Sequence, residues 1–492
     1  MTLRLPAILL ALAIGALPAA AGDRGLLNVL ARDLPRVAAA ERAAAAGAGG
    51  PDAVESQYGA ARDLEEALRL IVPVSLSCRP LLAAARSLAR GEILQAEGVD
   101  RPDPGATRRG LRQTGLAKRQ IDLSRARCRP GVAAARSARL PELDRPRSGE
   151  IFFGVIGSRA PPGASSAYVR VNHRRGRVAV HRGRLAFRPR LQPGRYDIRV
   201  DYVDARNRGV GSALSRAVWL LPSSAARHAA PTRPDGALSR RLSSLARSFP
   251  GHSAMWLHDL TTGRTAEWNA DARFPAASTV KLGVLIAALR RFGPRPERSR
   301  VAYDLEALTG WSSNLASNRL LVEIGGRETA GAQIAQRVLH RLGARSSTFT
   351  GDYRIGTAAA RMRANQPPLI SSRVTTARDL GRILFQLHAA AVGSRSALAA
   401  TGLTRHEARV ALALLLSFES TRDNAGLFQP ALGRRFPLAQ KNGWFSSVRH
   451  TAAVLYASDG PRIAVLLTYR PGITRVEAAA LGARFIRILR GT

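Results

Sequence analysis

Apolar and polar residues follow different periods in successive stretches of the chain. From residue 23 to about 146, apolar residues recur at helical spacing, as in Leu26–Ala31 and Ala60–Leu68, and this predicts amphipathic helices. From Gly149 the period changes to two, because Tyr168–Val171 and Tyr196–Tyr202 alternate apolar with charged residues. Such alternation is typical of short strands that bury one face. We therefore expect a helical region followed by an all-β region.

The last stretch, residues 236–492, mixes the two periods. Strand-like alternation occurs near both of its ends, and helical patterns fill the interval. This order predicts an α+β domain with one antiparallel sheet, built from both ends of the stretch and flanked by helices. The predicted strands are 254–260, 265–268 and a hairpin at 447–469, and the predicted flanking helices are 238–248 and 474–489.

The first residues have the pattern of a secretory signal peptide. Arg4 precedes the apolar run Leu5–Leu17, and small residues follow at Ala19–Ala21. The run is too short for a comfortable membrane span. We expect residues 1–21 to be removed, leaving an exported bacterial protein, extracellular or cell-wall associated, with no transmembrane segment.

Changes of composition place the domain boundaries. The short strands after Gly149 resemble a small immunoglobulin-like sandwich, which we interpret as a spacer rather than a docking surface. A stretch rich in Ser, Ala and Pro follows and has the composition of a linker. The expected domains are a helical domain at 22–146, an immunoglobulin-like β domain at 147–222, a linker at 223–235 and the α+β domain at 236–492.

Cys78 and Cys128 are the only cysteines. In an exported protein two cysteines indicate one disulfide, which here would close a loop of about 50 residues and contribute about 4 kcal/mol in the chain-entropy model. Two buried thiols are the alternative. Neither cysteine has the spacing of a metal ligand.

The formal net charge of +40 is extreme. It indicates either an anionic partner, such as a cell-wall polyanion, or a bias toward arginine codons. The arginines are spread through every segment without interleaved aromatic residues or a nucleic-acid-binding module. We therefore favour codon bias over a dedicated polyanion site, and the pattern argues against a nucleic acid partner.

Lysine is rare in this chain: only Lys118, Lys281 and Lys441 are lysines among 75 basic residues. Arginine does not give up its proton in proteins, so a site that transfers protons requires a different cation. Ser278 precedes Lys281 by three residues, which places both on one helix face. A serine becomes a nucleophile when a neighbouring base takes its proton. The alternative is chance, because S-x-x-K is a short pattern.

Two further motifs follow, Ser312-Ser313-Asn314 at a helix start and Lys441-Asn442-Gly443-Trp444 at the start of a strand. In this order the three motifs resemble the serine penicillin-recognising enzymes, and most of all the class A β-lactamases, whose pattern is S-x-x-K, S-D-N and K-T-G. The resemblance covers residues 236–492. It implies a β-lactamase/transpeptidase-like fold for this domain, and no metal or organic cofactor.

The resemblance also implies roles for the motif residues. The backbone N–H groups of Ser278 and Trp444 would form an oxyanion hole, with Asn442 and Gly443 beside the substrate. Taken without the other motifs, Ser312 would be a helix N-cap and Asn314 a turn residue. On the resemblance, Ser278 is the nucleophile, Lys281 its proton acceptor, Ser312 the donor to the leaving nitrogen, Asn314 the contact to the substrate amide, and Lys441 a positive charge for the substrate carboxylate.

The chain departs from the class A pattern in several places. Ser313 replaces the aspartate, Asn442 replaces threonine or serine, and the gap between the first two motifs is short. The glutamate that activates the deacylating water has no counterpart, because the loop 351–372 contains one acid, Asp352. Asp352 is either a substitute for that glutamate or a turn residue. Without a base at this place, the acyl-enzyme would form but hydrolyse slowly.

We therefore expect an exported serine hydrolase that opens β-lactams through an acyl-enzyme. One alternative is a D,D-peptidase or another amide hydrolase directed at peptidoglycan peptides, with slow β-lactam turnover. The other is a cell-wall-binding protein without catalytic activity, and the retention of Lys281 and Lys441 argues against it.

Overall fold

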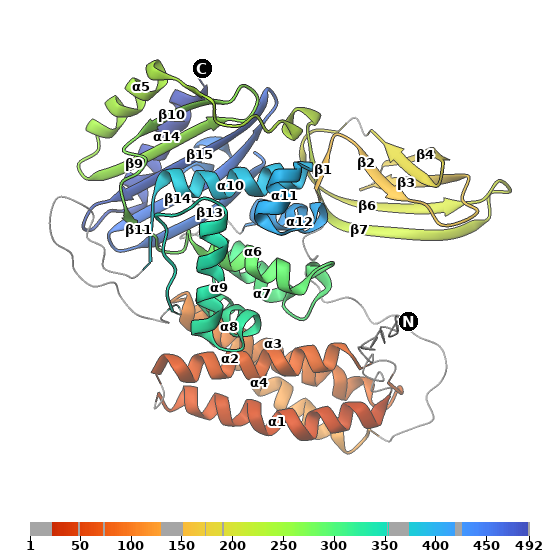
Figure 1. The fold of residues 1–492 in the computed structure, drawn as a ribbon. Coiled ribbons are helices and arrows are strands. Elements are labelled where there is room, and N and C mark those ends of the chain that lie inside the picture. The colour runs from red at the N-terminus through yellow and green to blue at the C-terminus, as the bar shows by residue number, and fades with distance from the viewer. Residues whose placement is uncertain are drawn as a thin grey trace, which may run out of the picture. The chain divides into compact units, whose positions relative to one another are not determined.

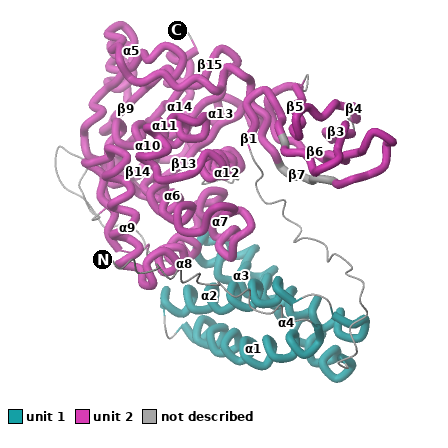
Figure 2. The backbone as a smooth tube through the Cα atoms, turned by 45° about the vertical axis from the view of Figure 1, so that its right-hand side comes forward, with its two compact units in different colours: residues 1–142 teal, residues 143–492 magenta. Residues whose placement is uncertain are grey.

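The computed structural model describes residues 22–128 and 151–490, apart from 48–49, 72–73, 173, 189–190, 352, 354–372 and 419–425. The predicted signal peptide at 1–21 lies outside the described residues. The chain divides into two compact units, residues 1–142 and 143–492 (Figure 2). In the described part of the chain, no helix is long and apolar enough to cross a membrane.

The first unit is helical, as its apolar period predicted. A Cβ on Gly91 would lie 2.6 Å from the Thr114 side chain, and one on Gly110 would lie 2.7 Å from the backbone of Gln95. Glycine at these positions allows the helices α3 and α4 to pack closely. The helices are α1 (Asp23–Ala45), α2 (Gly50–Arg69), α3 (Arg79–Asp100) and α4 (Pro104–Arg125).

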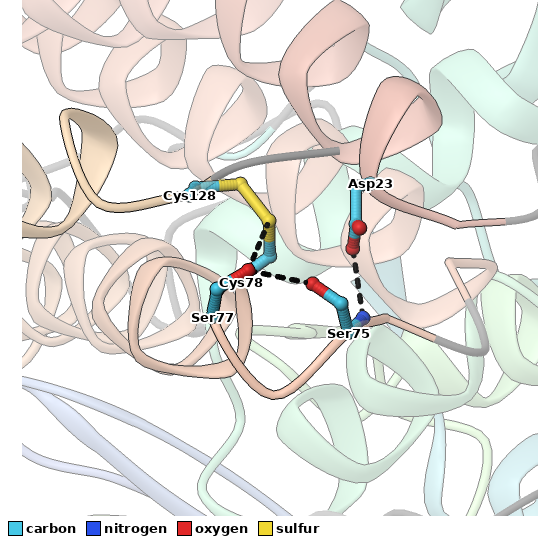
Figure 3. Close-up of a disulfide and its surroundings, with 5 residues drawn as sticks. All are labelled: Asp23, Ser75, Ser77, Cys78 and Cys128. Atoms are coloured by element: carbon cyan, nitrogen blue, oxygen red, sulfur yellow. Dashed lines mark hydrogen bonds between the residues drawn. A yellow bond between two sulfur atoms is a disulfide. The ribbon is translucent and has the colours of Figure 1, made fainter. Parts of the chain in front are cut away.

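Cys78 and Cys128 form a disulfide that joins the residue before α3 to the chain after α4 (Figure 3). Nearby, Ser75 donates its backbone N–H to the Asp23 carboxylate at 2.8 Å, which ties the start of α1 to the same loop (Figure 3). The two contacts therefore link both ends of the helical unit to the segment before α3.

A polar contact lies inside the helical unit. Gln57 Nε2 donates to Glu92 Oε2 at 2.7 Å, and the Glu92 side chain is fully buried. Burial raises the pKa of Glu92 to about 7, because the low-dielectric interior disfavours the carboxylate. This carboxyl group therefore changes its charge near neutral pH.

The β region contains the short strands that the alternation of apolar and charged residues predicted. Its strands form one series in the order β1-β7-β6-β3-β4-β5-β2. The long strand β4 pairs with β3 over residues 174–179 and with β5 at Val180 and His181, so it connects the two parts of this series. The strands are β1 (Ile151–Phe153), β2 (Ile156–Arg159), β3 (Ser166–Val171), β4 (Arg174–His181), β5 (Arg184–Phe187), β6 (Gly194–Val203) and β7 (Gly209–Leu221).

The segment that was predicted to be a linker packs against the last domain. His388 Nε2 donates to the Arg227 carbonyl oxygen at 2.9 Å, and Ala229 N donates to Leu260 O at 2.8 Å. The segment contains the short helix η1 (Ser223–Ala226) and the edge strand β8 (Arg233–Pro234).

The last domain contains the predicted sheet, in the order β13-β14-β15-β9-β10-β8. Strands from both ends of the domain meet where β15 pairs antiparallel with β9. Only the edge strand β8, which pairs parallel with β10, departs from the antiparallel pattern. The strands are β9 (His252–Asp259), β10 (Arg264–Trp268), β13 (Leu438–Phe445), β14 (Val448–Ala457) and β15 (Gly460–Tyr469).

Helices cover both faces of this sheet (Figure 1). One face packs on α5 (Gly236–Arg247) and α14 (Arg475–Arg490), through residues such as Leu245 and Phe485. The other face packs on a larger cluster that includes Leu285 and Leu384. Its helices are α6 (Lys281–Phe292), α7 (Ala302–Gly310), α8 (Asn314–Gly325), α9 (Glu328–Arg341), α10 (Ala377–Val392), α11 (Arg395–Thr401) and α12 (Arg405–Leu416).

Candidate active site

Ser278 lies in the turn that joins the short strand β11 (Phe274–Pro275) to α6. The sequence predicted Ser278 at the mouth of this helix, and the helix begins at Lys281. The preceding residue, Ala277, has a φ of 47°. This left-handed conformation is costly for a residue with a Cβ, and such strain is concentrated at functional sites. The Ser278 side chain is half-buried and remains accessible.

His450 holds the strand before Ser278 against the sheet. Its Nε2 donates to Pro275 O at 2.8 Å, and its Nδ1 accepts from Thr468 N at 3.2 Å. Burial lowers the pKa of His450 to about 4, so the ring is neutral at pH 7. His450 was not predicted as a site residue, because a lone histidine in a strand sequence does not reveal its partners.

The Lys281 side chain is fully buried. Its Nζ donates to the carbonyl oxygens of Ser312 at 2.7 Å and Ser313 at 3.1 Å, and to Asn314 Oδ1 at 2.7 Å. A buried ammonium requires such partners, because it has lost its hydration shell. The first two motifs therefore meet at this cation.

Lys441 and Ser312 join the third motif to the second. Lys441 Nζ donates to Ser312 Oγ at 2.7 Å and to the carbonyl oxygen of Asn442 at 2.9 Å. Burial lowers the pKa of Lys441 to about 7. Ser312 has a φ of 64°, which is the second left-handed non-glycine residue in the site.

Ser313, and not Ser312, caps the helix that carries Asn314. The Ser313 hydroxyl accepts from Ala316 N at 3.2 Å, as expected of an N-cap serine. The N-cap interpretation of Ser312 is therefore wrong, and its hydroxyl is bonded to Lys441 instead. Ser313 stands where class A enzymes have aspartate, and here it stabilises the start of α8.

Gly443 allows β13 to approach the turn that carries Ser278. A Cβ at this position would lie 3.0 Å from Ser278 N and 3.1 Å from Ala276 O, which is closer than side chains normally tolerate. The next residue, Trp444, is 38% exposed, and the Arg449 guanidinium lies 5.5 Å from its ring centroid. The backbone of β13 is therefore next to the expected nucleophile.

Asn442 points away from Lys441, because successive side chains of a strand lie on opposite faces. Its Oδ1 accepts from Thr451 Oγ1 at 2.8 Å, and the side chain is 3% exposed. The structure therefore does not bring the Asn442 side chain onto the face of Lys441, although the motif predicted a substrate contact.

Tyr353 is a site residue that the sequence analysis missed. Its ring centroid lies 4.3 Å from Lys281 Nζ and 4.2 Å from Arg373 Cζ, so two cations contact one aromatic ring. The Asn318 side chain makes two hydrogen bonds to the Tyr353 backbone. Tyr353 N donates to Asn318 Oδ1 at 2.7 Å, and Asn318 Nδ2 donates to Tyr353 O at 2.6 Å. The hydroxyl lies 3.4 Å from Ala277 O, and burial raises the pKa of the phenol.

A model of the Beta-lactamase enzyme family matches residues 237–295 and 300–488, about half of the 492-residue chain. The chain belongs to this family. No curated protein matches the sequence.

Several solved structures resemble the domain that this family match covers. PBP-A is 17% identical, with a TM-score of 0.42, over 53% of this chain and 99% of its own. A β-lactamase from Desulfarculus baarsii is 20% identical, with a TM-score of 0.41, over 52% and 98%. One from Xanthomonas campestris pv. campestris is 18% identical, with a TM-score of 0.40, over 52% and 97%.

In this β-lactamase-family domain, the structure describes part of the loop that precedes α10. Asp352 lies outside the described residues, and its neighbour Tyr353 is the described residue beside Lys281. Thr376 caps α10 by accepting from Asp379 N at 3.1 Å, but the Asp379 carboxylate binds Ser346 N and Ser347 Oγ at 2.9 Å. The Asp379 side chain therefore bonds the start of α10 to the segment at Ser346 and Ser347.

One sequence signal could have located Tyr353. Asn318 follows Asn314 by four residues, so both amides lie on one face of α8. A buried amide on the face that reaches Lys281 requires partners of its own. The backbone of Tyr353, in the loop before α10, is such a partner.

Proposed function

We propose that this protein is a serine acyl-transfer enzyme in which Ser278 is acylated by β-lactams and by amides of peptidoglycan peptides. The observation that carries the proposal is the 2.7 Å bond between Lys441 Nζ and Ser312 Oγ, beside the buried amino group of Lys281. It supports a role for the three motifs as one constellation. Neither contact would be needed for a plain N-cap or a chance S-x-x-K.

In the proposed reaction, the substrate carbonyl oxygen binds the N–H groups of Ser278 and Trp444. The Ser278 oxygen attacks the carbonyl carbon, and its proton passes to Lys281 in the neutral form. The amide C–N bond breaks, the Ser312 hydroxyl passes a proton to the leaving nitrogen, and Ser312 regains a proton from Lys281, which returns to its neutral form.

Lys441 and Asn314 orient the substrate in this mechanism. The positive charge of Lys441 attracts the substrate carboxylate and opposes protonation of Lys281. The oxygen of the Asn314 amide accepts from Lys281, so its NH₂ end is the donor for a substrate amide carbonyl.

Tyr353 supports one part of the proposal, which is that the acyl-enzyme is hydrolysed slowly. A deacylating water needs a base beside the ester. The described group next to Lys281 is a phenol whose pKa is raised by burial, and a phenol that keeps its proton does not serve as that base. This favours a D,D-peptidase or related amide hydrolase with slow β-lactam turnover.

Efficient β-lactam hydrolysis is the second candidate function, and the family match favours it. Asp352 would then act as the base, next to Tyr353 in the sequence. Both candidates predict covalent modification of Ser278. They differ in the lifetime of the adduct.

Intact-protein mass spectrometry with penicillin G tests the proposal on the full chain. We expect an adduct of the mass of penicillin G that persists for hours, is absent from Ser278→Ala, and forms normally in Ser244→Ala, a control on the exposed side of α5. An adduct that clears with many turnovers would favour the β-lactamase. Absence of any adduct on the folded protein, with penicillin G and with a D-Ala-D-Ala peptide thioester, would overturn acyl transfer.

We also propose that the protein is exported. The apolar run after Arg4 supports this proposal, as does the Cys78–Cys128 disulfide, because disulfides persist in oxidising compartments. N-terminal sequencing of the protein from an expressing bacterium should begin at Gly22. A chain that keeps Met1 would contradict export through a cleaved signal.

A further inference from the structure

The β region has one buried and one exposed face at strand β3. Ala167, Val169 and Val171 are buried in the core of this region. The alternate residues Tyr168 and Arg170 lie on the opposite face, because side chains alternate along a strand. The neighbouring strands β4 and β6 both pair antiparallel with β3. The register of these strands therefore determines which side chains lie beside Tyr168 and Arg170 on the exposed face.

The register places three arginines in a row across this face. Arg170 is directly opposite Arg175 on β4 and directly opposite Arg199 on β6, and all three are exposed. Like charges directly opposite each other destabilise a sheet. Among the described residues, the Arg170 side chain has no hydrogen bond or ion pair, whereas Arg199 Nε donates to the Asp201 carboxylate at 2.8 Å. The row therefore carries an uncompensated positive charge at its centre.

Tyr168 holds two guanidinium groups beside this row. Arg175 Cζ lies 4.1 Å from the Tyr168 ring centroid, and Arg177 Cζ lies 5.7 Å from it. Arg177 Nε also donates to Ser166 Oγ at 3.1 Å. Cation–π contacts of this kind orient guanidinium planes without neutralising them. We call Arg170, Arg175, Arg177, Arg199 and Tyr168 the arginine face.

Codon bias does not account for the charge of the β region. Residues 151–221 contain 14 arginines and 3 acidic residues, whereas the rest of the chain contains 61 basic and 32 acidic residues. A bias toward arginine codons would add arginines everywhere, but it would not remove acids from one domain. Two of the three acids, Asp197 and Asp201, lie two residues on either side of Arg199 in β6, and arginines outnumber acids on this part of the sheet.

We propose that the arginine face binds an extended polymer of phosphodiester-linked units, with one negative charge per repeat. Guanidinium groups bind phosphate through two parallel N–H···O bonds. Adjacent strands are about 4.8 Å apart, so the row spans roughly 10 Å, the scale of successive phosphates along one extended chain. This function is separate from the acyl-transfer site and does not depend on it.

Two other anionic partners fit the face less well. A membrane surface requires apolar groups that insert among the lipids, and the one aromatic ring of the face is covered by Arg175. A nucleic acid duplex is read by a helix or a β-ribbon that enters a groove, whereas this face is the broad side of a sheet.

The test uses the full chain and a synthetic poly(glycerol phosphate) chain as the probe. The triple variant R170Q/R175Q/R199Q should weaken binding at least tenfold and reduce the slope of log K against log salt by about three, because each released phosphate contact contributes about one. The matched control R240Q/R241Q/R247Q, on the exposed side of α5, removes the same charge and should bind within about twofold of the parent.

A second variant separates phosphate recognition from charge. R170K/R175K/R199K keeps the net charge but lacks the planar guanidinium groups. Its affinity should therefore lie between those of the parent and the glutamine variant. Circular dichroism and thermal unfolding of all variants establish that the β region is folded.

Three results would overturn the proposal. Equal loss of binding in the α5 control would assign the effect to net charge alone. Equal affinity for a polyuronate chain would exclude selection for phosphate. Binding that is confined to phosphatidylglycerol vesicles, and is lost in the triple glutamine variant, would assign the face to a membrane.

Discussion

The side chains of Ser312 and Lys441 meet in the site although 129 residues separate them in the chain, with Lys441 Nζ 2.7 Å from Ser312 Oγ. Lys441 is 1% exposed, and burial lowers its pKa to about 7. The charge of this residue therefore changes near neutral pH. Lys281 Nζ, in contrast, lies within hydrogen-bond distance of three oxygen acceptors.

We expect the rate constant of acylation to fall as the pH rises through about 7. The lowered pKa means that Lys441 is charged below this pH and neutral above it, and the neutral form no longer attracts the substrate carboxylate. Mass spectrometry of acylation by penicillin G from about pH 5 to about pH 9 measures the profile. Lys441→Ala should react more slowly throughout and lack the inflection. A rate that rises through pH 7 would identify Lys441 as a proton acceptor instead.

Replacement of Tyr353 by glutamate should shorten the life of the acyl-enzyme. The new carboxylate would lie beside Lys281, where it could take a proton from the attacking water, and a general base contributes about 10²-fold or more to such a step. The lifetime of the penicillin G adduct, followed by mass spectrometry, should fall at least tenfold.

Tyr353→Phe is the matched control for this change, because it keeps the ring beside Lys281 and Arg373 and removes only a hydroxyl 3.4 Å from Ala277 O. Its adduct should last as long as that of the parent. If both variants release the acyl group at the parent rate, Tyr353 does not limit hydrolysis.

Gly443→Ala should impair acylation with little effect on folding. Its Cβ would lie 3.0 Å from Ser278 N, so β13 would have to move away from the oxyanion donors. Loss of one such donor costs about 10²- to 10³-fold in rate. The control is Gly310→Ala in α7, where a Cβ has no atom within 4 Å, and it should react at the parent rate. Equal rates for both variants would show that β13 does not form the oxyanion hole.

The β-lactamase-family domain should lose stability as the pH falls from about 6.5 to about 4. Burial lowers the pKa values of His258, His388 and His450 to about 4, so the unfolded chain binds these protons first. Each histidine then costs about 3 kcal/mol across the window. Denaturant unfolding at both ends of the window measures the loss, and His450→Gln should reduce it by about 3 kcal/mol. An unchanged loss would contradict the assignment for His450.

The helical unit should respond to pH in the opposite direction. The pKa of Glu92 is raised to about 7, so the folded unit holds a proton that the unfolded chain releases near pH 4.5. The contribution is present below pH 4.5 and is lost as the pH rises through about 7, by about 3 kcal/mol. Hydrogen exchange of α3 amides should become faster over this range in the parent. Glu92→Gln should abolish the change, and a persistent change would point to another group.

Local patterns predicted much of the fold. The 3.6-residue period identified the helical unit, and the alternation near residues 254–268 and 447–469 identified the sheet strands, because these periods follow from backbone geometry alone. The strands of the β region were predicted, and their arrangement as an immunoglobulin-like sandwich stays a prediction. Alternation indicates strands but does not show that one long strand, β4, pairs with β3 at one end and β5 at the other.

The sequence by itself determined the type and order of the elements and the chemistry available at three short motifs. Serines, two rare lysines and an amide are recognisable without a structure, because their spacing places them at helix and strand starts. The tertiary structure decided which of these groups act together. It turned Asn442 away from Lys441, made Ser313 the cap of α8, and placed Tyr353 against Lys281. The physical reason is that strand register, helix packing and loop contacts join residues far apart in the chain, and no local period encodes them.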